Sequence, residues 1–433
     1  MMARLSREHF VDLRPLTTSP AFARMWAGST LSGLGGQLTL VAVMLQMYAL
    51  TGDTFAVSMI AVAGLVPMIL AGLYGGMLAD AFDRRAVALL AASVTFASTL
   101  VLAVLTWGGW ETQWWLYALS IVNAAANSIV MTARMAIVPR LLPVTLLPAA
   151  SALNGIAFGL MVMAGPALAG VLVATTGYAW TYTIDVVLMT SLFLGLWTLP
   201  SIRPEGTTVR PGLESLRDGW RFLRRASNIR AQYLMDITAM TFGQPLTLFP
   251  AIGAVLLGGG AITTGVLTAA VAAGTLLSSL FSGPIGRVRH HGLGIERAVI
   301  AYGAAIAAFG LVLVAANAGW FAPPRVDANI ALICAAAVLL ACSGAADNIS
   351  SIYRNTMMQS AVPDVMRGRL QGIFVVVVAG GPRVGALYAG ALATFTTLWF
   401  PPLLGGLIVI ALVATLARLH PRFRAYDALN PQP

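Results

Sequence analysis

Basic residues of this chain fall in every second gap between long apolar stretches, and the intervening gaps carry almost none. All 26 basic residues are arginine, and the formal net charge is +10. Short loops rich in basic residues stay on the cytoplasmic side of a membrane, so this alternation is typical of a protein that crosses the bilayer many times. The pattern argues against an ordinary soluble domain.

The composition agrees with this interpretation. Hydrophobic residues make up 58% of the 433 residues and charged residues only 10%, and the mean hydropathy is +0.82. No soluble domain of this length needs so much apolar surface. A membrane-crossing helix needs roughly 20 apolar residues, so the chain has room for about twelve. We predict an all-α membrane protein with transmembrane helices at 22–49, 55–79, 86–107, 113–134, 147–174, 179–199, 231–257, 261–285, 294–317, 328–353, 368–392 and 396–417.

The arginines also orient the predicted helices. They precede the first span and follow every second span, whereas the opposite loops hold Asp53, Glu111 and Asp327 against one basic residue, Arg325. Both termini are therefore expected in the cytoplasm. Basic residues that are all arginine indicate a GC-rich genome, so the expected location is the plasma membrane of a bacterium. Because the arginines follow the topology and can contact membrane lipids, we expect no nucleic acid as a partner.

Enzyme motifs are missing from the sequence. The four histidines lack partners at catalytic or metal-ligand spacing, and no phosphate-binding loop or Walker motif is present, which disfavours an ATP-driven pump. Cys334 and Cys342 stand eight residues apart in one predicted helix, a poor spacing for a metal. We expect a monomer that is not an enzyme and that holds no cofactor and no metal.

The longest polar stretch, residues 200–230, divides the chain near its middle. Leu213, Leu216, Trp220 and Leu223 recur in it at helical spacing with arginines between them, as in an amphipathic helix at a membrane surface. Such a helix either rests passively on the membrane or forms a regulatory binding site. We predict a first bundle at 1–200, a cytoplasmic linker at 201–230, a second bundle at 231–420 and a cytoplasmic tail at 421–433.

The two halves of the chain repeat several landmarks in the same order. Gly36 precedes Gly76 by 40 residues (76−36=40), and Gly243 precedes Gly283 by the same interval (283−243=40). The other matching landmarks are Asn127 and Arg134 with Asp347 and Arg354, and Gly165-Pro166 and Gly170 with Gly381-Pro382 and Gly385. Duplicated bundles around a central site are the plan of many membrane transporters.

Residues 76–85, Gly-Met-Leu-Ala-Asp-Ala-Phe-Asp-Arg-Arg, resemble the loop signature of the major facilitator superfamily. The sequence departs from the signature at Asp83, where the family usually has Gly, and at Arg287, which replaces the acidic residue in the second copy. Residues 165–170 resemble the antiporter motif in the fifth helix of exporters, with Ala169 in place of one glycine. The resemblance covers the whole chain and is strongest to the branch of enterobactin exporters and macrolide-efflux proteins.

This resemblance implies two six-helix bundles that work by alternating access, with a latch at the cytoplasmic side. The candidate latch residues are Gly76, Asp80, Asp83, Arg84, Arg85, Arg134 and Arg354. Asp80 follows a glycine-rich helix end, where it can cap a neighbouring helix and pair with arginines while that side is closed. The alternative is a static loop that only anchors the topology. The candidate residues of the antiporter-like motif, which forms either a leak-proof kink or simple close packing, are Gly165, Pro166 and Gly170.

Ionisable groups inside the predicted spans are costly in hydrocarbon and usually face a cavity, a partner or a proton route. We predict that Asp236 and Asp347, in spans that line the central cavity of the family, carry protons or contact substrate. Alternatively, Asp347 merely shares a helix face with Arg354, and Asp236 lies near the cytoplasmic boundary. Arg383 either pairs with an acidic residue or attracts an anionic substrate, and Asp185 is expected to be structural. The predicted cavity lining is Gln37, Asn123, Asn127, Met240, Phe242, Gln244, Asn348 and Tyr353.

Together these features predict a secondary transporter that exports small amphipathic molecules, such as drugs or siderophores, in exchange for protons. A lining of amide, aromatic and thioether groups suits bulky amphipathic molecules. The alternative within transport is a lipid or lysophospholipid translocator, which would work without protons. An alternative of another class is a transport-inactive membrane receptor or assembly factor, which would bind a ligand without moving it.

Overall fold

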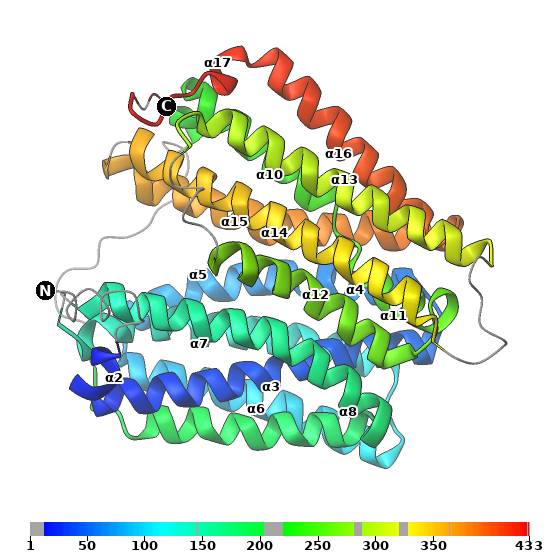
Figure 1. Ribbon diagram of the computed structural model, residues 1–433. Helices are drawn as coiled ribbons and strands as arrows, with labels where there is room; N and C mark the ends of the chain where they lie inside the picture. The colour runs from blue at the N-terminus through cyan, green and yellow to red at the C-terminus, as the bar shows by residue number, and fades with distance from the viewer. Residues whose placement is uncertain are drawn as a thin grey trace, which may run out of the picture. The chain divides into compact units, whose positions relative to one another are not determined.

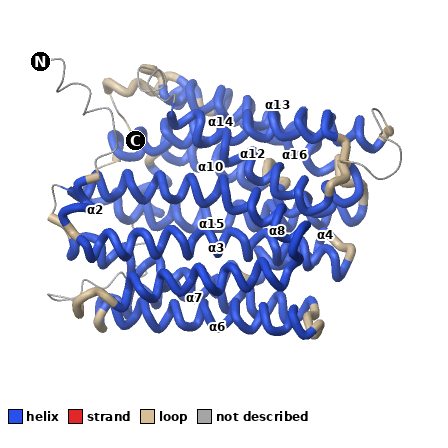
Figure 2. Tube along the Cα trace, turned by 60° about the horizontal axis from the view of Figure 1, so that its bottom comes forward, coloured by secondary structure: helices blue, strands red, loops and turns tan. Residues whose placement is uncertain are grey.

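The computed structural model describes residues 13–143, 146–202, 220–280, 288–319, 328–362, 364–430 and 432. Helices run through nearly all of this part of the chain, as Figures 1 and 2 show. Within it the β-structure is limited to one isolated bridge between His290 and Asp427. The all-α prediction is therefore confirmed.

Ten helical segments of the described residues are long and apolar enough to cross a membrane. One of them, Leu153–Trp197, has 45 residues, more than twice the roughly 20 that one crossing needs. Its helix is broken at Gly177, whose φ of 84° and ψ of 175° are open to glycine but strained for other residues. If this segment is counted as two crossings and helix α15 (Asp364–Phe395) is added, the described helices overlap with each of the twelve predicted ranges and are consistent with them. Residues 281–285 of the predicted span 261–285 lie outside the described part.

The chain divides into two compact units. Unit 1 consists of Met1–Val43 and Val66–Thr208, and unit 2 consists of Met44–Leu65 and Val209–Pro433. A short piece of the first half, from the end of the first predicted span to the start of the second, thus groups with the second half. Of the predicted linker, residues 203–219 lie outside the described part, and with them most of the expected amphipathic helix.

The helices of unit 1 are α2 (Arg14–Thr18), the first part of α3 (Pro20–Thr51), α5 (Leu65–Ala81), α6 (Arg84–Gly108), α7 (Gln113–Leu141) and α8 (Leu147–Trp197). Helix α6 packs against both α7 and α8 (Figure 1). Asp83 caps the start of α6 by accepting a hydrogen bond from the backbone of Arg85, and Gly109 ends the helix in the left-handed conformation. The core contains Phe22 and Met25 from α3, which pack with buried residues of α6, α7 and α8.

The helices of unit 2 are α4 (Thr54–Ala63), α10 (Ser227–Phe242), the 3-10 turn η2 (Leu246–Leu248), α11 (Phe249–Ala251), the π-turn η3 (Ile252–Leu256), α12 (Gly260–Leu280), α13 (His291–Asn317), α14 (Ile330–Ala361), α15, α16 (Phe400–Leu419) and α17 (Pro421–Arg424). Helix α14 packs against α12 and α13, and α10 packs against α13, α15 and α16. Their shared core is built on buried aromatic and aliphatic side chains such as Tyr233, Phe309 and Val409.

Helix α4 packs along α15 within unit 2. Thr54 donates to the carbonyl of Gly390 at 3.1 Å, and Thr394 donates to the carboxylate of Asp53 at 2.9 Å. A Cβ atom at Gly390 would collide with the side chain of Ser58. The absence of a side chain at Gly390 therefore allows these two helices to approach closely.

The chain end folds back onto unit 2. Arg424 forms an ion pair with Glu296 at 2.8 Å, and Arg289 contacts both carboxylate oxygens of Asp427, at 2.9 and 2.6 Å. The hydrogen bonds from Arg289 lower the pKa of Asp427 to about 2. Residues 420–430, which we call the C-terminal strap, are thus tied to the beginning of α13.

Candidate functional site

Three charged side chains meet inside unit 2, and we call them the Arg354 cluster. Arg354 on α14 donates through Nη1 to Asp236 Oδ1 on α10. Through Nη2 it reaches Oδ1 of Asp347 on its own helix at 3.4 Å. Asp347 and Arg354 are seven residues apart, which places them on the same face of α14 two turns away from each other. The helix spacing and the packing of α10 together assemble the cluster.

The charges of the Arg354 cluster do not balance. With both carboxylates ionised, two negative charges share one positive charge in a region where unpaired charge is costly. The side chains of Asp236 and Arg354 are 1% and 5% exposed, whereas that of Asp347 is 33% exposed. The second oxygen of Asp236 has no hydrogen-bond partner in the described structure. The cluster therefore has one sealed carboxylate and one accessible carboxylate.

The span that carries Asp236 is broken about two turns further along. Helix α10 ends at Phe242, and Pro245 cannot continue the ladder of backbone hydrogen bonds. The hydroxyl of Tyr302 on α13 donates to the carbonyl of Gly243 at 2.5 Å. This bond gives a partner to a backbone carbonyl group at the break in the helix. A Cβ atom at Gly243 would collide with the Tyr302 ring. Broken helices with satisfied carbonyl groups are common where membrane transporters bind ligands.

Several residues predicted to line a cavity surround this break. The Gln244 amide lies 3.7 Å from the sulfur of Met240. The ring of Phe242 meets Tyr388 of α15 edge to face at 5.3 Å. Arg383 lies on α15 and is half-buried, but the hydrogen bonds described for the Arg354 cluster do not include it. The break is thus bordered by thioether, amide and aromatic groups.

Two other predicted lining residues tie helices together. Asn348 donates to the hydroxyl groups of Ser278 and Ser279 on α12, each at 2.9 Å. Asn123 donates to Ser98 and Thr99 on α6, each at 3.3 Å. In this structure both amides join two helices of their own unit.

Tyr353 and Asn127 lie in different surroundings. Tyr353 is buried, and its ring lies 5.2 Å from that of His291 at the start of α13. Asn127 is exposed on α7. The structure therefore brings together only part of the predicted lining.

In unit 1 the antiporter-like motif lies in a close contact between helices. A Cβ atom at Gly165 on α8 would collide with the side chain of Gln37 on α3. Pro166 and Gly170 follow on α8, and Gly170 is also buried. Because small residues permit close approach of membrane helices, this motif sets the separation of α3 and α8 at Gln37.

A second buried carboxylate lies in the same helix pair. Asp185 on α8 is 1% exposed, and its Oδ2 accepts a hydrogen bond from Thr39 on α3 at 2.5 Å. Its other oxygen has no hydrogen-bond partner in the described structure and lies against Gly35. Asp185 therefore helps to hold α3 and α8 together.

Three of the candidate latch residues make contacts within unit 1, whereas Arg354 lies in the cluster of unit 2 described above. Asp83 accepts hydrogen bonds from the backbone of Arg85 at 3.0 Å and of Ile202 at 3.1 Å. Burial raises the pKa of Asp83, but hydrogen bonds from Ser201 and three backbone groups outweigh this effect and lower the pKa overall. Arg84 donates to the carbonyl of Ala136 at 2.9 Å, and Arg85 donates to that of Trp197 at 2.7 Å. These bonds tie the start of α6 to α7 and α8.

The other latch candidates are described less fully. Gly76 and Asp80 lie in α5, but the surroundings of Gly76 and the side chain of Asp80 lie outside the described part of the structure. Arg134 is half-buried on α7, and its Nε has no hydrogen-bond partner in the described structure. The predicted pairing of Asp80 with the arginines therefore lies outside the described part of the structure.

Comparison with known proteins decides the family. The sequence profile of the transmembrane secretion effector family matches residues 11–433. The chain belongs to this family of major facilitator transporters. It is similar to the enterobactin exporter EntS of Citrobacter koseri, with 28% identity over 387 residues that cover 89% of this chain and 88% of the relative. EntS of Escherichia coli O81 is 27% identical over the same lengths.

Solved structures of other membrane transporters have the same fold. A point mutant of the nucleoside transporter NupG superposes with a TM-score of 0.70 at 14% identity and covers 92% of this chain and 99% of its own. A POT family transporter in complex with a thioalcohol-conjugated peptide gives a TM-score of 0.71 at 11% identity, over 93% and 96% of the two chains. These structures show the fold alone. Membership of the family makes the protein a multi-pass membrane transporter and not an enzyme.

Some residues of this transporter's site were not found from its sequence. Tyr302 and Thr39 each bond to a group of the site, but both are single polar residues in apolar helices. Their positions in the sequence give no sign that they lie near an acidic residue or a helix break. Only the packing of α13 on α10 and of α3 on α8 reveals these contacts.

Proposed function

We propose that this transporter exports amphipathic small molecules of the siderophore or drug type from a bacterial cell in exchange for protons. The observation that carries the proposal is the unbalanced charge of the Arg354 cluster, in which two carboxylates share one guanidinium group. One bound proton would neutralise the cluster. A group of this kind can couple proton entry to a change of conformation.

The different exposure of the two carboxylates supports an order of events. The partly exposed Asp347 receives a proton from water, and the sealed Asp236 holds Arg354 in place. Tyr233 on α10 and Tyr302 on α13 are the further titratable groups close to Asp236. When a proton weakens the hold of the carboxylates on Arg354, α10 and α14 become free to rearrange.

The surroundings of the break and the relatives both support a substrate class. The break after α10 is bordered by Met240, Phe242 and Tyr388, which offer apolar and aromatic surface, and by the Gln244 amide. The enterobactin exporters that the chain resembles export a siderophore. We therefore propose a bulky molecule with aromatic groups, and we place its binding at this break.

The experiment uses the full-length protein in liposomes with an imposed pH gradient. Three probes are compared: iron-free enterobactin, a fluorescent amphipathic dye, and a fluorescent lysophospholipid. Movement of enterobactin or dye that follows the pH gradient supports the proposal. Movement of the lysophospholipid alone, independent of the gradient, would replace it with lipid translocation, and binding without movement would point to a receptor.

A further inference from the structure

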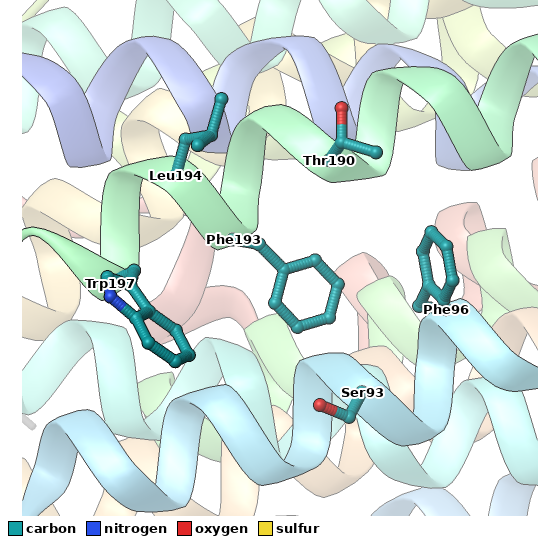
Figure 3. Close-up of a pocket in the computed structure, with 6 residues that line it drawn as sticks. All are labelled: Ser93, Phe96, Thr190, Phe193, Leu194 and Trp197. Carbon is teal, nitrogen blue, oxygen red and sulfur yellow. The ribbon is translucent and has the colours of Figure 1, made fainter.

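A groove opens between α6 and α8 in unit 1, away from the residues considered above. It has a volume of about 420 Å³ and is lined by Ser93, Phe96, Thr190, Phe193, Leu194 and Trp197. Figure 3 shows the aromatic rings of three of these residues around the space between the two helices. Phe96 and Phe193 meet edge to face at 5.6 Å. The lining is thus largely aromatic and apolar.

The two hydroxyl groups of the groove already have partners. Ser93 donates to the carbonyl of Leu89 at 2.9 Å, and Thr190 donates to that of Val187 at 2.6 Å. Neither hydroxyl therefore needs a hydrogen bond from a ligand. A hydrocarbon chain can bury the apolar surface of the groove without leaving a polar group unpaired. Leu194 and Trp197 are 68% and 70% exposed, so the groove is accessible from outside the unit.

A cation stands at one end of the groove. The guanidinium of Arg85 donates through Nη2 to the carbonyl of Trp197 at 2.7 Å. Its Nε is buried and has no acceptor among the described residues, but the residue as a whole is partly exposed. Arginine carries five N–H donors, and the described hydrogen bonds of Arg85 engage one of them. The nearby carboxylate of Asp83 accepts hydrogen bonds from the backbone at Arg85 and Ile202. Arg85 thus keeps donors free for an anion.

The distance along α6 from Arg85 to the far end of the groove matches half a bilayer. From Arg85 to Phe96 helix α6 rises about 16 Å, and one leaflet of the hydrocarbon core is roughly 15 Å thick. Trp197 stands at the arginine end, and tryptophan favours the level of the lipid headgroups. The groove and Arg85 therefore lie at the depths of an acyl chain and of its headgroup, respectively.

We propose that the groove between α6 and α8 binds one acyl chain of an anionic phospholipid, and that Arg85 holds the phosphate of its headgroup. Arginine and phosphate form strong charge-assisted hydrogen bonds. The leaflet is the one on the arginine-rich side, where anionic lipids attract basic residues. The proposal concerns binding alone and does not depend on the transported substrate.

The test uses full-length protein equilibrated with equal amounts of phosphatidylglycerol and phosphatidylcholine, and native mass spectrometry counts the lipids that it retains. Wild type is expected to retain an excess of phosphatidylglycerol. A hydrogen bond to a charged group contributes about 1.5–3 kcal/mol, so loss of the bond to phosphate in Arg85→Gln should lower this excess about tenfold or more. Arg140→Gln, at an exposed arginine of α7, should leave it unchanged. An equal loss in both variants, or no loss in Arg85→Gln, would overturn the proposal.

A second pair of variants tests the groove itself. Ser93→Phe fills the groove and should lower retention of both lipids, whereas Leu90→Phe, at a residue of α6 that is 70% exposed, should not. Retention by Ser93→Phe at the wild-type level would overturn the proposal.

If Ser93→Phe does not fold, the fluorescence of protein that keeps Ser93 tests whether lipid binds in the groove. The emission of Trp197 is obtained as wild type minus Trp197→Phe. Phosphatidylglycerol brominated on its acyl chains should quench it more strongly than brominated phosphatidylcholine. Equal quenching by the two lipids would contradict the proposal.

Discussion

Arg354 bonds to Asp236 although 118 residues separate them in the chain. The contact joins α14 to α10 at a buried point of unit 2, and Asp347 adds a second carboxylate from the side of α14. A pair like this is strongly destabilised when only one member is removed, because the other charge then stays buried alone. This asymmetry provides a test of whether the two residues act as a pair.

Replacing Arg354 with Gln should destabilise the transporter by about 3–5 kcal/mol, because two carboxylates then lack their cation. Thermal unfolding in detergent measures the loss, and Arg418→Gln at an exposed arginine serves as the control. The double variant with Asp236→Asn should recover part of the stability. If the double variant loses the sum of the single effects, the two residues do not act as a pair.

Alternating access predicts that the contact between α4 and α15 opens during transport. The hydroxyls of Thr54 and Thr394 lie 3.2 Å apart, so cysteines at both positions are close enough for a disulfide. In a background without Cys334 and Cys342, oxidation of the double variant should stop export, and a reductant should restore it. Each single cysteine variant should be insensitive to oxidant. Undiminished export by the cross-linked protein would argue against alternating access at this contact.

Gly165→Ala should destabilise unit 1 by about 1–3 kcal/mol and lower export, because the new methyl group overpacks the contact with Gln37. Gly155 on the same helix has open space around its Cβ position. Gly155→Ala should therefore be tolerated and serves as the matched control. Thermal unfolding and export assays on both variants make the comparison, and equal stability of the two would show that the contact at Gly165 is not tight.

The C-terminal strap should respond to acid at low pH only. The pKa of Asp427 is lowered to about 2 by Arg289, and its usual value in an unfolded chain is about 4. The ion pair therefore stabilises the strap fully above pH 4, and this contribution is lost as the pH falls through 2. A spin label at the exposed Leu429 should keep constant mobility from pH 8 to pH 5 and become mobile in stronger acid. Asp427→Asn should mobilise it at pH 7, and a transition near pH 6 in wild type would contradict this assignment.

Much of the fold could be predicted from the sequence, because hydropathy and the alternation of arginines report directly on membrane crossing. The helices are broken at Gly177 and at the Gly243–Pro245 segment. The hydropathy pattern alone did not predict that α10 ends before Gly243. The spacing of Asp347 and Arg354 placed them on one face of one helix. The contact of Arg354 with Asp236 depends on which helices pack together, and periodicity within single helices does not encode that choice.

Proton movement driven by substrate tests the central claim most directly. Full-length protein in liposomes with a trapped pH dye receives iron-free enterobactin or an amphipathic dye, and the resulting proton flux is measured for wild type, Asp236→Asn, Asp347→Asn and the control Glu111→Gln. We predict proton flux in wild type and in Glu111→Gln, and loss of the flux in Asp236→Asn and Asp347→Asn while substrate still binds. Wild-type proton flux in both aspartate variants would contradict coupling through the Arg354 cluster.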